Sequence, residues 1–303
     1  MRIAYRLGNK HLPTYASKFS RKDACTLPQL FACLALRQFY NLSYRRTEAL
    51  LKDAKDLCRA VRIEKPPDHN TLCDAFDTLC RIERFAPMLD ELAAAFEKAG
   101  LLKFDEKPLS ADSTHYEGRH VSRHFERRKR ESSKRKTPAG PGESTRSETN
   151  KRLPKLGLAV ACACHLILSV WAGTGSGSDH PHFDTLMYHA WKRAPVRTVV
   201  ADAGYDSEPN HELVRHDLGC ESLIPPLIGR PADDPHFVTT RFRQLMKETP
   251  GDERERALYG QRWQSETVNS MMKRNYGSSL RAKTPERRER EMMLKAMVHN
   301  FAL

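Results

Sequence analysis

Three features are missing from the 303-residue sequence, and each absence excludes a class of protein. No two of the eight cysteines have C-x-x-C spacing, so we do not expect a zinc ribbon or zinc knuckle. No apolar run reaches the length of about 18 residues that a transmembrane helix needs. The chain opens with the polar, basic stretch MRIAYRLGNK, which lacks the apolar centre of a signal peptide. These absences predict a cytoplasmic protein with reduced thiols.

Positive charge is what the sequence has in excess. It contains 51 lysines and arginines against 38 aspartates and glutamates, which gives a formal net charge of +13. Such an excess favours a polyanionic partner, and nucleic acid is the first candidate. The charge is concentrated, because residues 119–152 hold 12 Lys or Arg and 4 Asp or Glu, which accounts for +8 of the +13.

Residues 119–152 contain almost no apolar side chains, so they cannot build a core of their own. We interpret them as a basic, flexible insertion between two strands of a larger domain. They are either a solvated linker or an arm that follows the DNA backbone, and the charge density favours the arm. The residues that we expect to contact DNA there are Arg127, Arg128, Lys129, Arg130, Lys134, Arg135 and Lys136.

The first hundred residues show the apolar periodicity of helices. The predicted helices cover residues 27–40, 43–61, 71–85 and 86–99. Ser43 is a good N-cap for the second helix, and Asp68 or Asn70 for the third. Gly100 is a suitable stop for the fourth. This pattern predicts a small all-α unit, which is either a DNA-docking or dimerisation unit or a plain helical bundle.

After Gly100 the spacing of apolar residues is no longer helical throughout, and strand-like segments alternate with helix-like ones. We expect strands at 107–114, 196–202 and 220–226, a hairpin at 155–173, and helices at 184–194, at 208–219 and near the C-terminus. This order predicts a mixed α/β domain.

Three carboxylates come from three of these elements. Asp112 is expected to end the first strand, Asp202 ends another buried strand, and Glu266 lies on the late helix. Carboxylates at the ends of buried strands are costly unless they bind something. If the two strands are neighbours and the helix crosses them, the carboxylates converge. Three oxygen ligands suit Mg²⁺ or Mn²⁺, and two such ions can support displacement at a phosphodiester.

The late helix is expected to run without a break through YGQRWQSETVNSMMKR, residues 259–274. Tyr259, Arg262, Glu266 and Lys273 then share one face, because residues three, four and seven apart lie together on a helix. The stripe is either a solvated face with a surface Arg–Glu pair or a carboxylate ligand flanked by phosphate-binding cations. Trp263 is rotated away from this face, so we expect it to pack in the core rather than stack on a base.

Three sequence blocks together resemble the DDE transposases of bacterial insertion sequences. LSADSTHY matches the first Asp block and VVADAGYDSEPN the second, and YGQRWQSETVNSMMK fits the Y-(2)-R-(3)-E-(6)-K signature at all four positions. LSYRRTEALL and PPDHNTL resemble the helical region that precedes the catalytic domain in that family. The similarity runs from about residue 30 to the end of the sequence, and the basic segment 119–152 has no counterpart in it.

The resemblance implies an α/β fold, with a ribonuclease H-like mixed sheet flanked by helices over residues 105–303. A small all-α N-terminal domain, residues 1–104, would precede it and bind DNA or dimerise. Asp112, Asp202 and Glu266 would be the catalytic metal ligands for two Mg²⁺ ions, for which Mn²⁺ can substitute. Arg262 and Lys273, with Tyr259 beside them, would contact DNA.

The activity implied is metal-dependent cleavage of DNA at transposon ends, followed by strand transfer into target DNA. The partners would be terminal inverted repeats and target DNA, bound by a homodimer that associates with the nucleoid in the cytoplasm of a prokaryote. Two alternatives stay open. One is a metal-dependent nuclease of the same fold, and the other is a non-cutting DNA-binding protein derived from a transposase.

Overall fold

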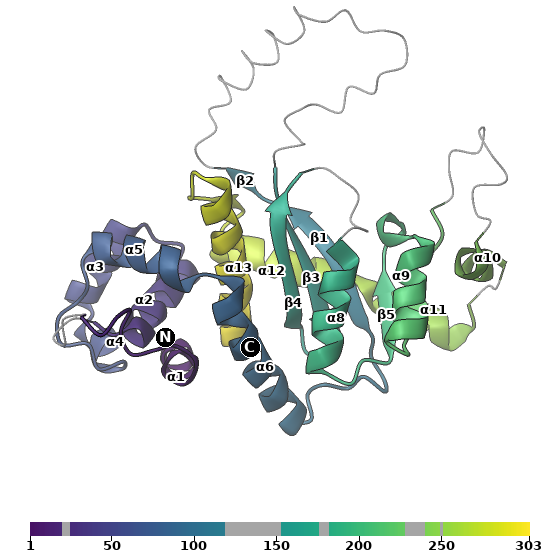
Figure 1. The fold of residues 1–303 in the computed structure, drawn as a ribbon, viewed down its shortest axis with the longest axis horizontal. Helices are drawn as coiled ribbons and strands as arrows, with labels where there is room; N and C mark the ends of the chain where they lie inside the picture. Colours follow the sequence, from purple (N-terminus) through teal and green to yellow (C-terminus); the bar gives the residue numbers. More distant parts are fainter. Residues whose placement is uncertain (20–24, 119–152, 176–181, 228–239, 249–250) are drawn as a thin grey trace, which may run out of the picture.

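The computed structural model describes residues 1–19, 25–118, 153–175, 182–227, 240–248 and 251–303. A group of helices at the N-terminal end lies beside a layered region that contains the sheet (Figure 1). These helices are α1 (Arg2–His11), α2 (Leu27–Phe39), α3 (Tyr44–Asp53), α4 (Lys55–Arg59) and α5 (His69–Leu79). α6 (Ile82–Lys98) follows them and packs against the layered region. The all-α character predicted for this region is thus confirmed.

Local capping explains where several of these helices begin. The Ser43 side chain accepts a hydrogen bond from the Arg46 N–H at the start of α3, and Asp68 caps α5 in the same way. Gly100, just beyond α6, has a φ of 69°, a left-handed value that glycine adopts without strain. The two predicted N-caps and the predicted stop are therefore present.

Two of the predicted helix boundaries were wrong. The helix expected over residues 43–61 divides at Ala54 into α3 and α4. The fourth helix was expected to begin at residue 86, but α6 begins at Ile82, so Pro87 lies inside the helix. A proline there removes one backbone hydrogen bond. The helix continues because its buried face, which includes Phe85, Met88 and Leu92, has to stay against the core.

The main sheet has five strands in the order β4-β3-β1-β5-β6. The strands are β1 (Leu109–His115), β3 (Pro154–Ala161), β4 (Leu166–Thr174), β5 (Thr198–Ala201) and β6 (Glu221–Leu223). β3 runs antiparallel to β1 and β4, whereas β1, β5 and β6 are parallel. A β-hairpin followed by parallel strands joined through helices is the ribonuclease H-like arrangement, so the predicted fold class is confirmed.

Helices cover both faces of this sheet. α8 (Phe183–Arg193) packs against β3 and β4 on one face, and α12 (Trp263–Tyr276) and α13 (Pro285–Ala302) pack on the other (Figure 1). Alternation along β3 supplies both cores, because successive side chains of a strand point to opposite faces. Leu158 and Val160 join the core beneath α12 and α13, while Ala159 and Ala161 join the core beneath α8.

The remaining elements are shorter. They are β2 (Glu117–Gly118), a 3₁₀ turn at Ala203–Tyr205, α9 (Glu208–Glu212) with a π-helical turn at Leu213–Asp217, α10 (Arg241–Glu248), α11 (Glu253–Tyr259), a 3₁₀ turn at Gly260–Arg262, and β7 (Ser279–Leu280). β2 and β7 pair in parallel as a separate two-stranded sheet. Cys162 and Cys164 lie in the turn between β3 and β4.

The N-terminal helices share a hydrophobic core with the far end of the chain. Leu34 of α2 and Leu72 of α5 belong to the same buried cluster as Met272 of α12 and Met297 of α13. The division at residue 104 into a DNA-binding or dimerisation unit and a catalytic unit stays a prediction.

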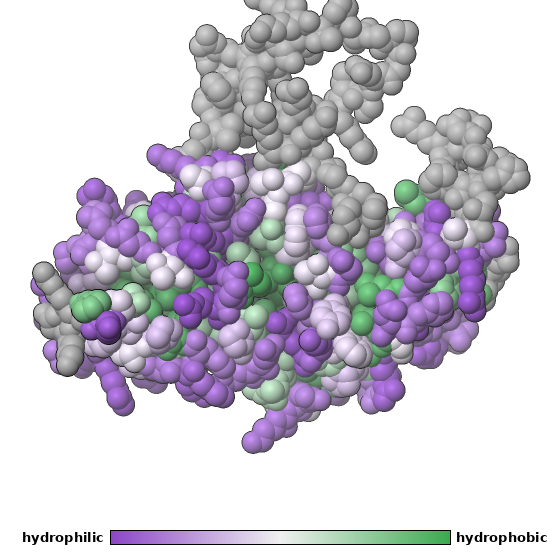
Figure 2. Space-filling model, viewed as in Figure 1, coloured by the Kyte–Doolittle hydropathy of each residue, from purple (hydrophilic) through white to green (hydrophobic). Residues whose placement is uncertain are grey.

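Hydrophilic side chains dominate the surface of the molecule in the view of Figure 2, with hydrophobic ones in small separate patches. Within the described residues, no helix has both the length and the apolar character needed to cross a membrane.

Candidate active site

Asp112 stands where two neighbouring strands separate. The parallel pairing of β1 with β5 covers Leu109 to Ala111, and Ala111 lies opposite Ala201. Asp112 is therefore the first β1 residue beyond this pairing, and Asp202 directly follows β5. β1 itself does not end at Asp112, as the sequence had suggested. It continues to His115 because its other edge stays paired with β3.

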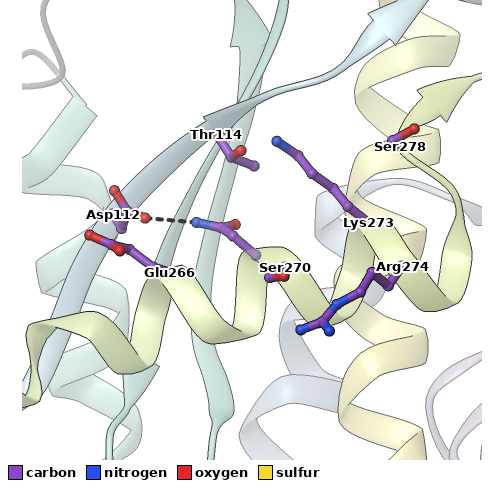
Figure 3. A pocket seen from close by; sticks show the side chains of 8 residues that line it. Asp112, Thr114, Glu266, Ser270, Lys273, Arg274 and Ser278 are labelled. Atoms are coloured by element: carbon purple, nitrogen blue, oxygen red, sulfur yellow. Dashed lines mark hydrogen bonds between the residues drawn. The ribbon is translucent and has the colours of Figure 1, made fainter.

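α12 brings Glu266 to the same place. The hydroxyl of Ser110 on β1 donates a hydrogen bond to the Ser265 hydroxyl at 2.8 Å, and Ser265 and Ser110 are both fully buried. This contact ties the start of α12 to β1. The carboxylates of Glu266 and Asp112 consequently lie next to each other at one end of a pocket (Figure 3).

Asp112 is the most electrostatically perturbed of the three carboxylates. Burial raises its pKa from the usual 3.8 to about 6, and the negative charges of Asp202 and Glu266 add to this increase. The Ser113 N–H and the Asn269 side chain act in the opposite direction, since both donate hydrogen bonds to the carboxylate. The Asn269 Nδ2 lies 2.8 Å from the Asp112 Oδ2. Asp202 and Glu266 are thus close enough for their charges to influence the pKa of Asp112.

The donor set fits a hard divalent cation, because it consists of carboxylate oxygens. The described residues nevertheless contain no cluster of three His, Cys, Asp or Glu side chains close enough to hold an ion in this arrangement. The Glu266 Oε1 instead pairs with Arg262 at 2.7 Å, and the Asp202 Oδ1 accepts the Gly204 N–H at 2.9 Å. All three carboxylates predicted as ligands are therefore bonded to other groups of the chain.

A pocket of about 490 Å³ extends from Asp112 and Glu266 along α12. Its cations are Lys273 and Arg274, on the same helix as Glu266 (Figure 3). Burial lowers the pKa of Lys273, and the charges of Asp112 and Glu117 partly restore it. One end of the pocket is therefore acidic and the other end basic, a polarity suited to a metal-bound phosphodiester.

The stripe that the sequence predicted is only partly present. Tyr259 ends α11, the 3₁₀ turn follows, and α12 begins at Trp263, so the expected continuous helix is broken at Gly260. Arg262 and Glu266 still form the i,i+4 pair, and Lys273 lines the pocket. Trp263 was expected in the core, but its side chain is 53% exposed. Trp263 belongs to α12 and lies three residues before Glu266, so helical geometry places both side chains on one side of the helix.

The structure adds residues to the pocket that sequence reasoning did not select. Asn269 lies three positions after Glu266, on the same face of α12, and Thr114 lies two positions after Asp112 on the same side of β1. Helical and strand periodicity alone could have found them. The basic residues expected to contact DNA within 119–152 lie outside the described residues.

The strand order and the two helix layers define the chain as a ribonuclease H-like protein. A family model described as a transposase DDE domain matches residues 97–301, about two thirds of the chain. The protein therefore belongs to the transposase DDE domain family.

Two further comparisons add less. A search of curated proteins found no match. Among solved structures, the chain is similar to the crystal structure of a pre-cleavage Mos1 transpososome, with 10% sequence identity and a TM-score of 0.25. That match covers 97% of this chain and 82% of the other. A TM-score this low supports no conclusion about fold or function.

We expect Asp112→Asn to stabilise the metal-free protein at pH 8. The folded-state pKa of about 6 lies above the unfolded value, so ionising Asp112 costs folding free energy above pH 6. The gain should reach up to about 3 kcal/mol at pH 8 and disappear as the pH falls to about 4. Thermal unfolding in EDTA across this pH range measures it. Asp56→Asn, at an exposed carboxylate, is the matched control, and equal effects of the two changes would contradict the prediction.

Proposed function

We propose that this protein is a transposase that cleaves DNA at the ends of a mobile element and joins the freed 3′ ends to target DNA. One observation carries the proposal. Asp112 and Asp202 follow the last paired residues of two neighbouring parallel strands, and α12 places Glu266 beside Asp112. We propose that these three carboxylates hold two Mg²⁺ ions, or Mn²⁺ in their place.

Bound ions would activate the attacking hydroxyl and stabilise the charge on the phosphate. The residues of the chain prepare this site. Asp112 has to lose its proton before it can act as a ligand, and Asn269 orients its carboxylate through the 2.8 Å hydrogen bond. Glu266 would hold a metal ion in place of Arg262, its present partner, and the Arg262 guanidinium would then be available for a DNA phosphate. Lys273 provides a second cation within the same pocket.

Strand transfer separates this function from its two alternatives. The assay uses a labelled duplex that carries the inverted repeats flanking the gene, together with an unlabelled target. A transposase produces a joined product longer than the substrate. A metal-dependent nuclease of the same fold produces cuts without joining, and a non-cutting DNA-binding protein shifts the duplex without any cleavage.

The proposed partners are the terminal inverted repeats and target DNA, bound by a homodimer. Two element ends have to be brought together for transposition, and two copies of one chain provide this with twofold symmetry. Light scattering of the protein with and without a terminal-repeat duplex measures the stoichiometry. A complex with the mass of two chains and two duplexes is expected, and separate complexes of one chain with one duplex under all conditions would contradict the dimer.

Arg262→Ala and Lys273→Ala are each expected to reduce single-turnover cleavage by at least about tenfold, since a charged hydrogen bond contributes about 1.5–3 kcal/mol. Arg262→Lys should restore only part of the activity, because an ammonium cannot grip two phosphate oxygens at once. Melting temperatures measured on the same preparations should change little, because an exposed pair contributes below about 1 kcal/mol. Normal cleavage by both alanine variants would leave Arg262 and Glu266 as a surface ion pair.

The basic segment is proposed to contact the DNA backbone. Deleting residues 123–150 should weaken DNA binding and flatten its salt dependence, since each lost phosphate contact lowers the log–log slope by about 0.9. Fluorescence anisotropy with a duplex at several salt concentrations measures this slope. An unchanged slope would show that the segment makes no phosphate contacts.

A further inference from the structure

A second cavity, of about 390 Å³, lies away from the carboxylates. It is formed where the N-terminal helices meet the segment between β7 and α13. Four of its lining side chains are cations: Arg37, Arg281, Lys283 and Arg287. No step of the proposed reaction uses these residues.

Arg37 is the unusual member of this group. It lies on α2 with only 4% of its surface exposed. Its guanidinium carbon lies 4.1 Å from the ring centroid of Tyr44 and 6.0 Å from that of Phe76, so the rings contact the guanidinium and leave its N–H edge for other partners. Throughout the described part of the chain, no acceptor lies within hydrogen-bonding distance of its buried Nε. A buried charged donor without an acceptor is costly, and an anion would remove that cost.

The acidic groups around the cavity are occupied elsewhere. The Glu291 carboxylate accepts the backbone N–H groups of Arg281 and Ala282, with its closest contact at 2.8 Å. Asp77 pairs with Arg287 and Arg290. These bonds hold both carboxylates in place, and they leave the Nε of Arg37 unsatisfied.

The start of α13 adds to the positive potential of the cavity. Thr284, a lining residue, is the N-cap of this 18-residue helix. The N-terminus of a long helix carries a partial positive charge, which favours an oxyanion. Here that charge acts mainly through the helix dipole, because Pro285 has no N–H and the Arg287 N–H is bonded to the Thr284 side chain. Lys283 precedes it in sequence and is exposed to solvent, so it can approach a ligand without losing a protein partner.

We propose that this cavity is a phosphate-binding site, in which Arg37 and Lys283 hold a phosphate group at the start of α13. The DNA backbone is the source that the geometry favours. Ser278 lines the catalytic pocket and Arg281 lines the second cavity, so one short segment joins the two sites. A DNA strand that leaves the catalytic pocket along this segment would place one of its phosphates there. The inference concerns binding only and does not depend on cleavage.

The first experiment measures phosphate binding directly. Sodium phosphate should raise the melting temperature of the wild-type protein above its value in sodium chloride of equal ionic strength, because a ligand of the folded state stabilises it. Lys283→Ala and Arg37→Met should lose this increase. Lys98→Ala, at an exposed lysine on α6, is the matched control and should keep it. Arg37→Met should fold, since it replaces an unsatisfied buried charge with an apolar chain.

No increase in the wild-type protein, or an equal increase in all four proteins, would overturn the proposal. The source of the phosphate is then decided by DNA binding in EDTA, where no cleavage takes place. If the site takes a backbone phosphate, Arg37→Met should lower the salt slope for duplex binding by about 0.9, an effect that a buried residue cannot exert through general surface charge. Arg37→Met could instead lose the phosphate-dependent rise in melting temperature while the salt slope of duplex binding stays unchanged. That outcome would assign the site to free phosphate and contradict binding of a DNA phosphate there. The melting-temperature measurement and the DNA-binding measurement in EDTA do not require cleavage. Both therefore test the phosphate site even if the protein fails the strand-transfer assay.

Discussion

Neutralising any one of the three carboxylates is expected to abolish DNA cleavage while leaving DNA binding in place. Asp112→Asn, Asp202→Asn and Glu266→Gln each keep the shape of the side chain and remove the charge that a divalent ion requires. Loss of a metal ligand forfeits several kcal/mol of transition-state stabilisation, so cleavage should fall by more than about 100-fold. Single-turnover cleavage of a labelled terminal-repeat duplex measures the loss, and anisotropy with the same duplex measures binding.

Asp56→Asn is the control for this series, because its carboxylate is exposed and pairs with Arg59 on the surface. It should cleave at the wild-type rate. Cleavage within tenfold of wild type by any one of the three variants would remove that residue from the metal site. Loss of DNA binding together with cleavage would indicate that the folded structure, rather than the chemistry, had been damaged.

The largest loss of stability is expected at Lys295. This lysine of α13 is fully buried, and its Nζ donates hydrogen bonds to the backbone carbonyls of Tyr276 at 2.7 Å and Gly277 at 2.6 Å. It therefore satisfies carbonyls at the C-terminal end of α12, and its positive charge favours that end of the helix. Lys295→Ala removes both hydrogen bonds, leaves the Tyr276 carbonyl with only its 3.3 Å bond from Gln38, and opens a cavity. The free energy of unfolding should therefore fall by about 3–5 kcal/mol.

Lys295→Met separates the two contributions, because methionine fills most of the same volume without donating a hydrogen bond. Its free energy of unfolding, from urea titration, should lie between those of wild type and Lys295→Ala. Lys98→Met, at an exposed helical lysine, should stay within about 0.5 kcal/mol of wild type. A fully stable Lys295→Met protein would mean that the two carbonyl bonds contribute nothing.

Much of the architecture could be predicted from local patterns. The β3–β4 hairpin and α8 are where apolar periodicity placed them, and the end of β5 at Ala201 leaves Asp202 at the expected position. Short-range signals suffice for such elements, because alternation, capping residues and glycine stops act within a few residues. The roles of Asp112, Asp202 and Glu266 in metal binding remain predictions.

The wrong predictions of where elements end have a common physical cause. At these positions tertiary packing outweighs the local sequence pattern. Nothing in the residues around Asp112 reveals that β3 continues to pair with β1 after β5 has left it. Similarly, Gly260 lies inside a favourable helical pattern, yet the chain takes a 3₁₀ turn there. The Ser110–Ser265 contact, which fixes α12 on β1, joins residues far apart in sequence and could not be predicted from either stretch alone.

The core that α2 and α5 share with α13 also bears on how the protein is made. During synthesis the N-terminal helices leave the ribosome long before α13, whose Leu294 and Met297 complete the cluster around Phe31 and Leu72. Until α13 emerges, those helices have no partner for part of their apolar surface, and long-range contacts of this kind form slowly. The nascent chain is consequently exposed to chaperones and proteases until late in translation. A product truncated before α13 is expected to be cleared rather than to accumulate beside the full chain.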